Sequence, residues 1–244
     1  MSGPRVALFD IETAPTRGWV WTNYEANLIN TDKDWYMLSF SFKWLGEKKI
    51  TTYALPDFAG YRSNKECDKA LIKKLWEVFD EADILVGHNS KQFDTKKANA
   101  RFLVNGLRPP SPYKQIDTLQ IARSRFKFGS NKLNDLGVAL GVGKKLPHTG
   151  AHLWFSCMAG DPKSWSLMKR YNARDVELLA AVYEKLKPWH PNHPDMNLYY
   201  DGGRCPTCQS ADVQKRGVMV KLSSRRQRMH CQSCGTWYSS GKPL

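Results

Sequence analysis

The sequence contains no long hydrophobic run. No stretch approaches the roughly 18 consecutive apolar residues that a membrane-spanning helix requires. The N-terminal residues, MSGPRVALFDIET, also lack the apolar region of a secretory signal peptide. We therefore expect a protein that resides in the cytoplasm and has no membrane partner.

Acidic residues are scarce relative to basic ones. The 244 residues include 23 Asp+Glu against 37 Lys+Arg, which leaves a formal net charge of +14 at pH 7. An excess of this size favours a polyanionic partner, and nucleic acid is the leading candidate. The hydrophobic fraction of 41% and the chain length fit one or two globular domains that bury a core without disulfides.

Cysteine is also too sparse for a disulfide framework. Four of the six cysteines form two Cys-x-x-Cys pairs, Cys205/Cys208 and Cys231/Cys234, separated by 22 residues. Such pairing is typical of a closed tetrahedral Zn²⁺ site with four thiolates. The other two, Cys67 and Cys157, are predicted to be reduced and partly buried.

Apolar periodicity predicts alternating strands and helices through residue 187. Residues 36–45 and 50–55 read as a hairpin, and a short strand end at 116–118 leads into a helix through 123. The remaining predicted elements are strands at 5–10 and 83–87 and helices at 66–79, 93–105 and 162–186, the last with Asp161 or Ser164 as its cap. The sequence therefore predicts an α/β fold, a mixed sheet flanked by helices.

The composition changes after the last of these helices. Residues 187–194 contain three prolines, which disfavour a helix and indicate a stiff linker. We predict a domain at 1–190, a Pro/Gly-rich linker at 191–203 and a small β-type metal-binding domain at 204–244. Since about 40 residues support little core, metal binding should supply much of the folding energy of the last domain.

Acidic residues recur where predicted strands end. Asp10 and Glu12 are two residues apart on the first strand, so both side chains point to the same face. Asp94 follows the strand at 83–87, and ligands of open α/β sheets bind at the carboxyl ends of strands. Asp175 lies in the middle of the strongest helix, where Asp has poor propensity and no cap to make. Tyr171 lies four residues before Asp175 on the same face of this helix, where its role is either core packing or function.

Three ordered motifs here resemble those of the DEDD exonucleases, in the tyrosine-containing subgroup. They are Phe9-Asp-Ile-Glu12-Thr, Asn89-Ser-Lys-Gln-Phe93-Asp94 and Tyr171-Asn-Ala-Arg-Asp175. The resemblance covers residues 4–187 and implies an RNase H-like fold. Residues 204–244 resemble a zinc ribbon, and this ribbon and the small size of the chain are most similar to phage or bacterial members. For a phage-encoded protein, the implied location is the bacterial host cell.

The resemblance implies 3′–5′ exonuclease activity on single-stranded DNA or RNA ends by a two-metal mechanism. Asp10 would bridge two Mg²⁺ or Mn²⁺ ions, Glu12 and Asp175 would hold the one that activates water, and Asp94 would help hold the other. These hard cations prefer oxygen ligands. Tyr171, whose unperturbed pKa is near 10, fits an orienter of water better than a general base. Asp117, in a segment similar to one in such exonucleases, is predicted to cap a helix.

Several residues are candidates for nucleic-acid contact. Lys144, Lys145 and His148 precede the last helix on a loop, although surface residues without function fit the same pattern. Arg225, Arg226 and Arg228 lie between the cysteine pairs, and Trp237 and Tyr238 follow them, which suits phosphate contacts and base stacking. Residues 196–244 contain 8 Lys+Arg and 2 Asp+Glu, so their net charge is +6. A ribbon that only packs on the first domain is the alternative.

Two other functions remain open at the level of sequence. An RNase H-like fold also hosts structure-specific endonucleases that act on RNA or hybrids. A non-catalytic module that binds nucleic acid is the second alternative. The complete set of four acids and a tyrosine argues against the latter, because an inactive site should have lost at least one member.

Overall fold

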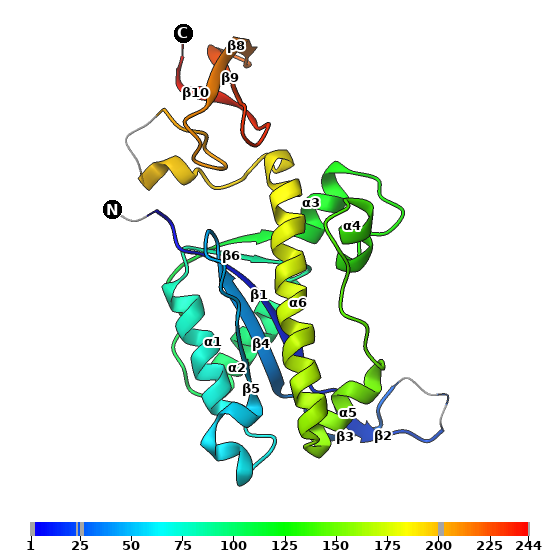
Figure 1. The fold of residues 1–244 in the computed structure, drawn as a ribbon. Helices are drawn as coiled ribbons and strands as arrows, with labels where there is room; N and C mark the ends of the chain where they lie inside the picture. The colour runs from blue at the N-terminus through cyan, green and yellow to red at the C-terminus, as the bar shows by residue number, and fades with distance from the viewer. Residues whose placement is uncertain (1–2, 23, 25–26, 200–202, 244) are drawn as a thin grey trace.

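A five-stranded mixed sheet forms the centre of the larger part of the molecule. The structure, a computed structural model, describes residues 3–22, 24, 27–199 and 203–243. The first three strands in spatial order are antiparallel neighbours, and β6 and β7 continue parallel to β1 (Figure 1). The order across the sheet is β5 (Thr51–Ala54), β4 (Met37–Trp44), β1 (Val6–Thr13), β6 (Ile84–Gly87) and β7 (Lys114–Asp117).

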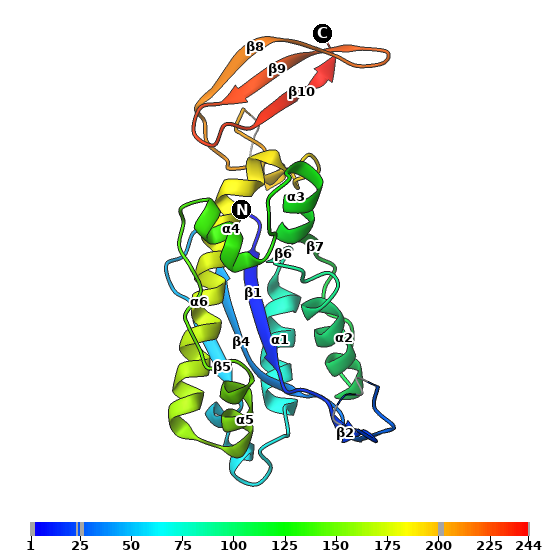
Figure 2. The same ribbon diagram turned by 90° about the vertical axis from the view of Figure 1, so that its right-hand side faces the viewer.

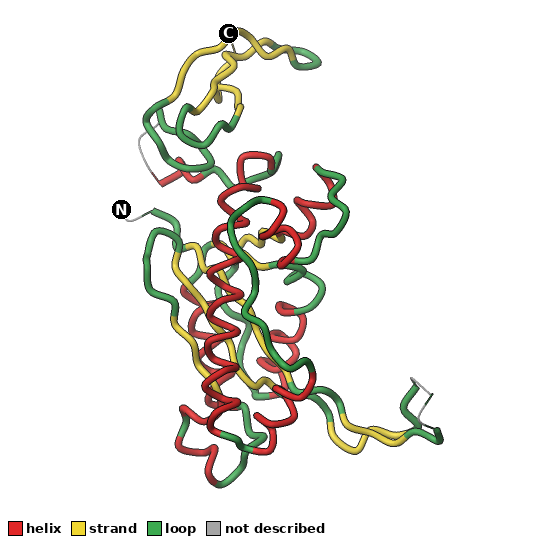
Figure 3. The backbone as a smooth tube through the Cα atoms, turned by 45° about the vertical axis from the view of Figure 1, so that its right-hand side comes forward, coloured by secondary structure: helices red, strands yellow, loops and turns green. Residues whose placement is uncertain are grey.

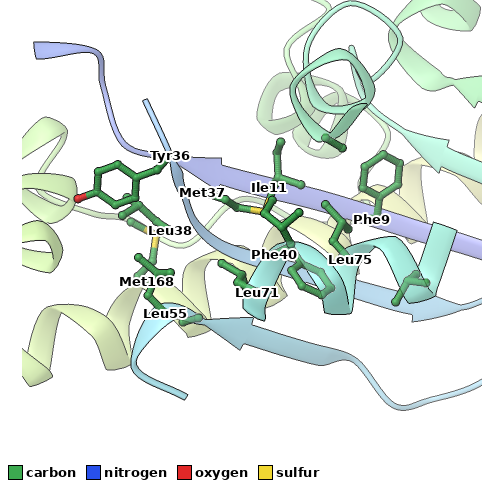
Figure 4. Close-up of a cluster of buried hydrophobic side chains, with 14 of the residues drawn as sticks. Phe9, Ile11, Tyr36, Met37, Leu38, Phe40, Leu55, Leu71, Leu75 and Met168 are labelled. Atoms are coloured by element: carbon green, nitrogen blue, oxygen red, sulfur yellow. The ribbon is translucent and has the colours of Figure 1, made fainter. Parts of the chain in front are cut away.

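One face of the sheet packs against helices α1 (Lys69–Glu81) and α2 (Asp94–Val104). Phe9 and Ile11 of β1 point to this face and share a hydrophobic cluster with Leu71 and Leu75 of α1 (Figure 4). The ring of Phe9 meets that of Phe79 edge-on at 5.0 Å between centroids. Because side chains alternate between the two faces of a strand, the odd-numbered apolar residues of β1 lie in this core.

The opposite face packs against α3 (Thr118–Arg125), α4 (Leu133–Ala139) and α6 (Pro162–Leu186) (Figure 2). Val6 and Leu8 of β1 point to this side. By the same alternation Asp10 and Glu12 must face it too, beyond the last apolar residue of the series. The fold thus aims both carboxylates at α6.

Helix α6 has the predicted bounds, Pro162–Leu186, and at 1.5 Å per residue its 25 residues span about 37 Å. Asp161 caps it by accepting a 2.8 Å hydrogen bond from the amide of Ser164, and Pro162 occupies the first turn. Beneath the helix, β4 presents the fully buried Ser39 and Ser41. Such small side chains allow α6 to lie close to the sheet.

The predicted fold class and the β4/β5 hairpin are confirmed, and most boundaries shift by one to three residues. The predicted capping role of Asp117 is also confirmed, because its carboxylate accepts from the amide of Leu119 at 3.0 Å. Two strands and two α-helices of the described chain were not predicted, namely the hairpin β2 (Arg17–Trp19)/β3 (Asn30–Lys33), α4, and α5 (Ala151–Ala159). In the described part of the chain, no helix combines the length and apolar character that a bilayer span requires.

The predicted end of the helix at the proline-rich segment is confirmed, whereas the predicted burial of Cys67 was wrong. Helix α6 ends at Leu186, the proline-rich segment contains the short 3₁₀ turn Lys187–Trp189, and a second such turn, Met196–Tyr199, follows it. A 3₁₀ turn tolerates the proline at its first positions, and the ring of Trp189 packs on Phe126. Residues 200–202 of the predicted linker lie outside the described residues. Of the two isolated cysteines, Cys67 is exposed and Cys157 is buried, since Cys67 precedes α1 and Cys157 lies on the inner face of α5.

The C-terminal part is a three-stranded antiparallel sheet beyond the C-terminal end of α6 (Figures 2 and 3). Its order is β10 (Trp237–Pro243), β9 (Arg225–Cys231) and β8 (Val213–Val220). Met196 joins it to the larger part. The Met196 side chain is buried in the core beside α6, its amide donates to the carbonyl of Pro206 at 2.7 Å, and its carbonyl accepts from Gln209.

Candidate functional site

Three carboxylates meet between β1 and α6. Each of Asp10, Glu12 and Asp175 places an oxygen within 4.8 Å of the oxygens of the other two. Asp10 and Glu12 come from the end of β1, and Asp175 comes from the middle of α6, where it is buried at 1% exposure. The structure therefore brings together three of the four acids that the sequence singled out.

Asp94 lies beside this group rather than inside it. It is the first residue of α2 and is buried, and its Oδ1 accepts a 3.2 Å hydrogen bond from the amide of Ile11, which lies between the two acids of β1. Its negative charge contributes to the raised pKa of Asp10, which shows that the two carboxylates interact. One carboxylate oxygen is thus used to fix Asp94 on β1.

Asn172 is a site residue that the sequence argument did not single out. Its amide donates to Oδ2 of Asp10 at 2.7 Å, and its carbonyl oxygen accepts from the hydroxyl of Ser39 at 3.3 Å. The side chain is fully buried. It orients Asp10 from α6. Its position one residue after Tyr171, three before Asp175, was the only sequence signal for it.

The four acids have raised pKa values. Burial raises the pKa of Asp10 well above its usual range, and the charges of Glu12, Asp94 and Asp175 add to the effect. Burial, followed by repulsion from Asp175, raises the pKa of Glu12 to about 8. Burial also raises the pKa of Asp94 to about 7 and that of Asp175 above its ordinary value. Such a cluster carries its full charge at neutral pH only when cations neutralise it.

Lys145 supplies one such cation from the protein. Its ammonium group lies 2.6 Å from Oδ2 of Asp175 and donates to the hydroxyl of Tyr171 at 3.2 Å. Burial lowers the pKa of Lys145, but attraction to Asp175 outweighs it and the net direction is upward. The sequence suggested a phosphate contact for this lysine, whereas the structure pairs it with the acidic cluster. Lys144 is exposed, with its carbonyl bonded to Arg174.

Tyr171 packs in an aromatic cluster, and its hydroxyl accepts a hydrogen bond from Lys145 beside the acidic cluster. It is 5% exposed and packs edge-on against the rings of His148 and Trp154, at centroid distances of 4.8 and 5.8 Å. Burial and then the charge of Asp175 raise its pKa above 10, so the phenol stays protonated at neutral pH. Its hydroxyl is therefore a hydrogen-bonding group at the carboxylates. His148 is exposed at the edge of this aromatic cluster.

The carboxylate site fits divalent cations. Oδ1 of Asp175 is buried and, within the described part of the chain, has no hydrogen-bond partner. A buried carboxylate oxygen without a partner is costly unless a cation binds it. All the converging donors are carboxylate oxygens, the ligands that Mg²⁺ and Mn²⁺ prefer.

The four paired cysteines form a second cluster. Their sulfurs all lie within 4.8 Å of one another, with Cys205 and Cys234 3.7 Å apart and Cys208 and Cys231 3.6 Å apart. Four sulfurs placed about 2.3 Å from a central Zn²⁺ would be separated by about 3.8 Å, so the cluster is compatible with zinc. No disulfide joins the described cysteines.

The same turn brings each cysteine pair together. After Cys208 and after Cys234 the chain adopts positive φ, 64° at Gln209 and 77° at Gly235. In both turns the amide of that residue donates to the carbonyl of the first cysteine of the pair, at 2.9 and 3.0 Å. The reversal places both sulfurs of a pair on the same side, which explains the Cys-x-x-Cys spacing.

The residues of the ribbon that are predicted to contact nucleic acid lie on two different faces of its sheet. Alternation along β9 places Arg226 and Arg228 on the face of Trp237, whereas Arg225 and Tyr238 point to the other face. The guanidinium of Arg226 donates hydrogen bonds to backbone carbonyls of β10, the shortest at 2.8 Å. Tyr238 faces the segment 195–206, and Arg228 and Trp237 are exposed together. Nucleic-acid contact by these residues stays a prediction.

Comparisons with known proteins locate the fold. A search of curated protein sequences found no match. Among solved structures, the chain is similar to the family B DNA polymerase of the hyperthermophilic archaeon Pyrobaculum calidifontis, with 19% sequence identity and a TM-score of 0.54. The likeness covers 77% of this chain but only 25% of the polymerase, so it shows a shared fold alone.

The family comparison covers the sheet, its helices and all four acids. A sequence model of the RNase_H superfamily matches residues 7–187, from β1 through the end of α6. The match therefore includes both the strand and the helix that bring the carboxylates together. Because it spans well over half of the chain, this protein belongs to the RNase_H superfamily.

Proposed function

We propose that this protein is a metal-dependent 3′–5′ exonuclease of the DEDD type, tyrosine subgroup, that hydrolyses single-stranded ends of DNA or RNA. The observation that carries the proposal is the convergence of Asp10, Glu12 and Asp175 within 4.8 Å, with Asp94 beside them. Membership of the RNase_H superfamily supports a nuclease. The net charge of +14 supports a nucleic-acid substrate.

The acidic cluster would hold two Mg²⁺ or Mn²⁺ ions through Asp10, Glu12, Asp94 and Asp175. When bound, such ions supply a water nucleophile at neutral pH and stabilise charge on the leaving oxygen of the phosphodiester. Asn172 keeps Asp10 oriented through its 2.7 Å hydrogen bond. Asp94 is held in place by the amide of Ile11.

Tyr171 and Lys145 act at the same carboxylates. The raised pKa of Tyr171 keeps its proton on the phenol oxygen, so the hydroxyl can donate to a water or a phosphate oxygen but cannot serve as a base at neutral pH. Lys145 holds a positive charge 2.6 Å from Asp175 and contacts the Tyr171 hydroxyl, which fixes the position of that group. Both residues therefore position the reacting groups.

The ribbon would be a structural zinc domain that helps bind the substrate. Zn²⁺ would be held by Cys205, Cys208, Cys231 and Cys234, whose spacing supports this role. The catalytic candidates all precede residue 190, and the ribbon adds a net charge of +6 over residues 196–244. We therefore assign chemistry to the domain at 1–190 and a share of the binding to residues 204–244.

The test is digestion of 3′-labelled and 5′-labelled single-stranded DNA and RNA with Mg²⁺ or Mn²⁺. We expect stepwise release of mononucleotides from the 3′ end and no cleavage of circular strands. The key variant is Asp175→Asn, which keeps the size of the side chain and removes its charge. Its control is Glu177→Gln, an equivalent change at an exposed acid of the same helix that forms an ion pair with Arg174.

The two variants should differ clearly in their rates of hydrolysis. Asp175→Asn should lose nearly all hydrolysis while it keeps its fold and substrate binding, and Glu177→Gln should retain normal activity. Cleavage of circular substrate would favour a structure-specific endonuclease instead. Binding without cleavage under every metal condition would favour a non-catalytic module. Near-normal cleavage by Asp175→Asn would overturn the metal assignment.

A further inference from the structure

The exposed face of the ribbon carries an ordered aromatic stack. Trp237 of β10 lies directly opposite His230 of β9. Their rings are nearly parallel, with an interplanar angle of 18° and a centroid distance of 4.1 Å. Trp237 nevertheless remains 51% exposed. The stack thus holds a large aromatic side chain in a fixed orientation while leaving much of it open to solvent.

A guanidinium group lies beside this stack. The central carbon of the Arg228 guanidinium is 5.3 Å from the centroid of the Trp237 ring. Nε of Arg228 donates to the carbonyl of Arg216 on β8 at 2.7 Å, which fixes the side chain across the ribbon. Arg228 is exposed, so its terminal nitrogens can donate to a phosphate.

The charge around the stack is of one sign. From Val213 to the last residue the sequence contains no Asp or Glu, and it contains seven Lys+Arg. An exposed tryptophan with an arginine beside it, on strands that carry no acidic residue, is unsuited to a basic or a purely apolar partner. A polyanion with flat aromatic rings matches both properties, because every base offers a face for stacking and every linkage a phosphate.

We propose that Trp237, stacked on His230 and flanked by Arg228, binds single-stranded nucleic acid by stacking with a base and contacting an adjoining phosphate. The proposal rests on the function proposed above and adds a second, separate contact for the same substrate. The stacking term is independent of base identity. We therefore expect a contact that raises affinity without selecting a sequence.

The position of the stack makes this contact dependent on substrate length. The carboxylates lie at the middle of α6, and the ribbon lies beyond its C-terminal end (Figure 2). From Asp175 to Leu186 the helix rises about 16 Å. A trinucleotide has two steps between its nucleotides, which span about 7 Å at the helical rise of one strand and roughly twice that when the strand is fully extended. A trinucleotide at the carboxylates therefore should not reach the ribbon, whereas a strand of 20 nucleotides can.

The first experiment compares Trp237→Ala with Leu222→Ala, a control at a fully exposed apolar residue in the turn between β8 and β9. Binding of a fluorescent single-stranded 20-mer is measured by anisotropy with the full, zinc-loaded chain carrying Asp10→Ala to prevent cleavage. Loss of one stacked base should weaken binding about five- to a hundredfold for Trp237→Ala, with an unchanged salt slope. Leu222→Ala should bind normally. In an otherwise wild-type chain, Trp237→Ala should hydrolyse a trinucleotide at the normal rate.

The second experiment uses two arginines of one strand. Arg228→Ala and Arg225→Ala remove the same charge, but only Arg228 shares the face of Trp237. Arg228→Ala should weaken 20-mer binding more and reduce the salt slope by about 0.7, the value for one phosphate contact on a single strand. Equal effects of both variants would show a diffuse charge effect and overturn the proposal.

Folding is controlled by zinc content and by Trp237→Phe. The phenyl ring should retain part of the affinity, which a purely structural role in the ribbon would not require. If Trp237→Ala loses its zinc, Trp237→Phe and the arginine pair decide the outcome. Normal 20-mer binding by Trp237→Ala overturns the proposal while trinucleotide cleavage leaves the exonuclease function intact. Trp237-dependent binding without any cleavage would contradict only the exonuclease function.

Discussion

Neutralising Glu12 should stabilise the metal-free protein while it removes activity. The pKa of Glu12 is raised from 4.5 to about 8. A carboxyl group with a raised pKa in the folded state holds its proton there while the unfolded chain has released it. Stability is therefore fully present below about pH 4.5, falls as the pH rises from 4.5 to about 8, and stays low above that range.

The pKa shift sets the size of the effect. A difference of about 3.5 pH units corresponds to at most about 5 kcal/mol at 1.36 kcal/mol per unit. Glu12 is partly exposed, and solvent screening reduces the expected loss to roughly 2–4 kcal/mol. Glu12→Gln carries no charge at any pH, so it should avoid this loss. For a chain of this size the thermal midpoint should rise by about 5–15 °C at pH 9 without Mg²⁺ or Mn²⁺.

The assay is thermal unfolding of the full chain between pH 5 and 9, in buffer without Mg²⁺, Mn²⁺ or chelator so that the ribbon keeps its zinc. The difference between wild type and Glu12→Gln should grow with pH and shrink when Mg²⁺ is added. Glu177→Gln, at an exposed acid, should follow the wild type. A Glu12→Gln protein that melts at or below the wild-type temperature at pH 9 would refute repulsion within the cluster.

Two further variants test the tyrosine and the ribbon. Tyr171→Phe should lower the turnover rate about ten- to a thousandfold with little change in binding, because one positioned hydroxyl is lost and the ring remains. The control in single-turnover cleavage is Tyr183→Phe, which removes another hydroxyl of α6, one that is bonded to His193. An unaltered rate for Tyr171→Phe would show that Tyr171 has a packing role only. Cys234→Ser should abolish zinc binding and make the ribbon sensitive to protease, since metal binding contributes on the order of 10 kcal/mol to such small domains. The exposed Cys67→Ser is its control, and a protease-resistant ribbon in Cys234→Ser would show that the strands fold without metal.

The elements that the sequence predicted well are those with strong local signals. Helix α6 has an N-cap, a proline in its first turn and a long apolar stripe, and its predicted bounds are those of the structure. Helix α5 has none of these signals. Its N-cap is Gly150 at a φ of 63°, and no side chain caps it. Only tertiary packing, such as that of Trp154 against Tyr171, accounts for its position.

The candidate site follows the same division. Strand alternation predicted that Asp10 and Glu12 would share one face, and only the resemblance to the DEDD exonucleases implied that Asp175 would join them. The partners of these acids were not predictable, because they depend on contacts between distant segments. Lys145 reaches Asp175 from 30 residues earlier in the chain, and Asn172 reaches Asp10 across 162 residues. No local sequence pattern predicts a contact between residues so far apart in the chain.

The anchoring of the ribbon has a consequence for how a substrate would be held. The side chain of Met196 is buried in the core beside α6, and its backbone is bonded to Pro206 of the ribbon. The two parts are therefore joined at a packed point in addition to the chain itself. Two binding sites held in this way have a high effective concentration relative to each other, because no long flexible tether dilutes the second encounter. Under the proposed function, a strand that dissociates from the carboxylates while bound to the ribbon would remain within their reach, which favours repeated cleavage of one molecule over exchange between molecules.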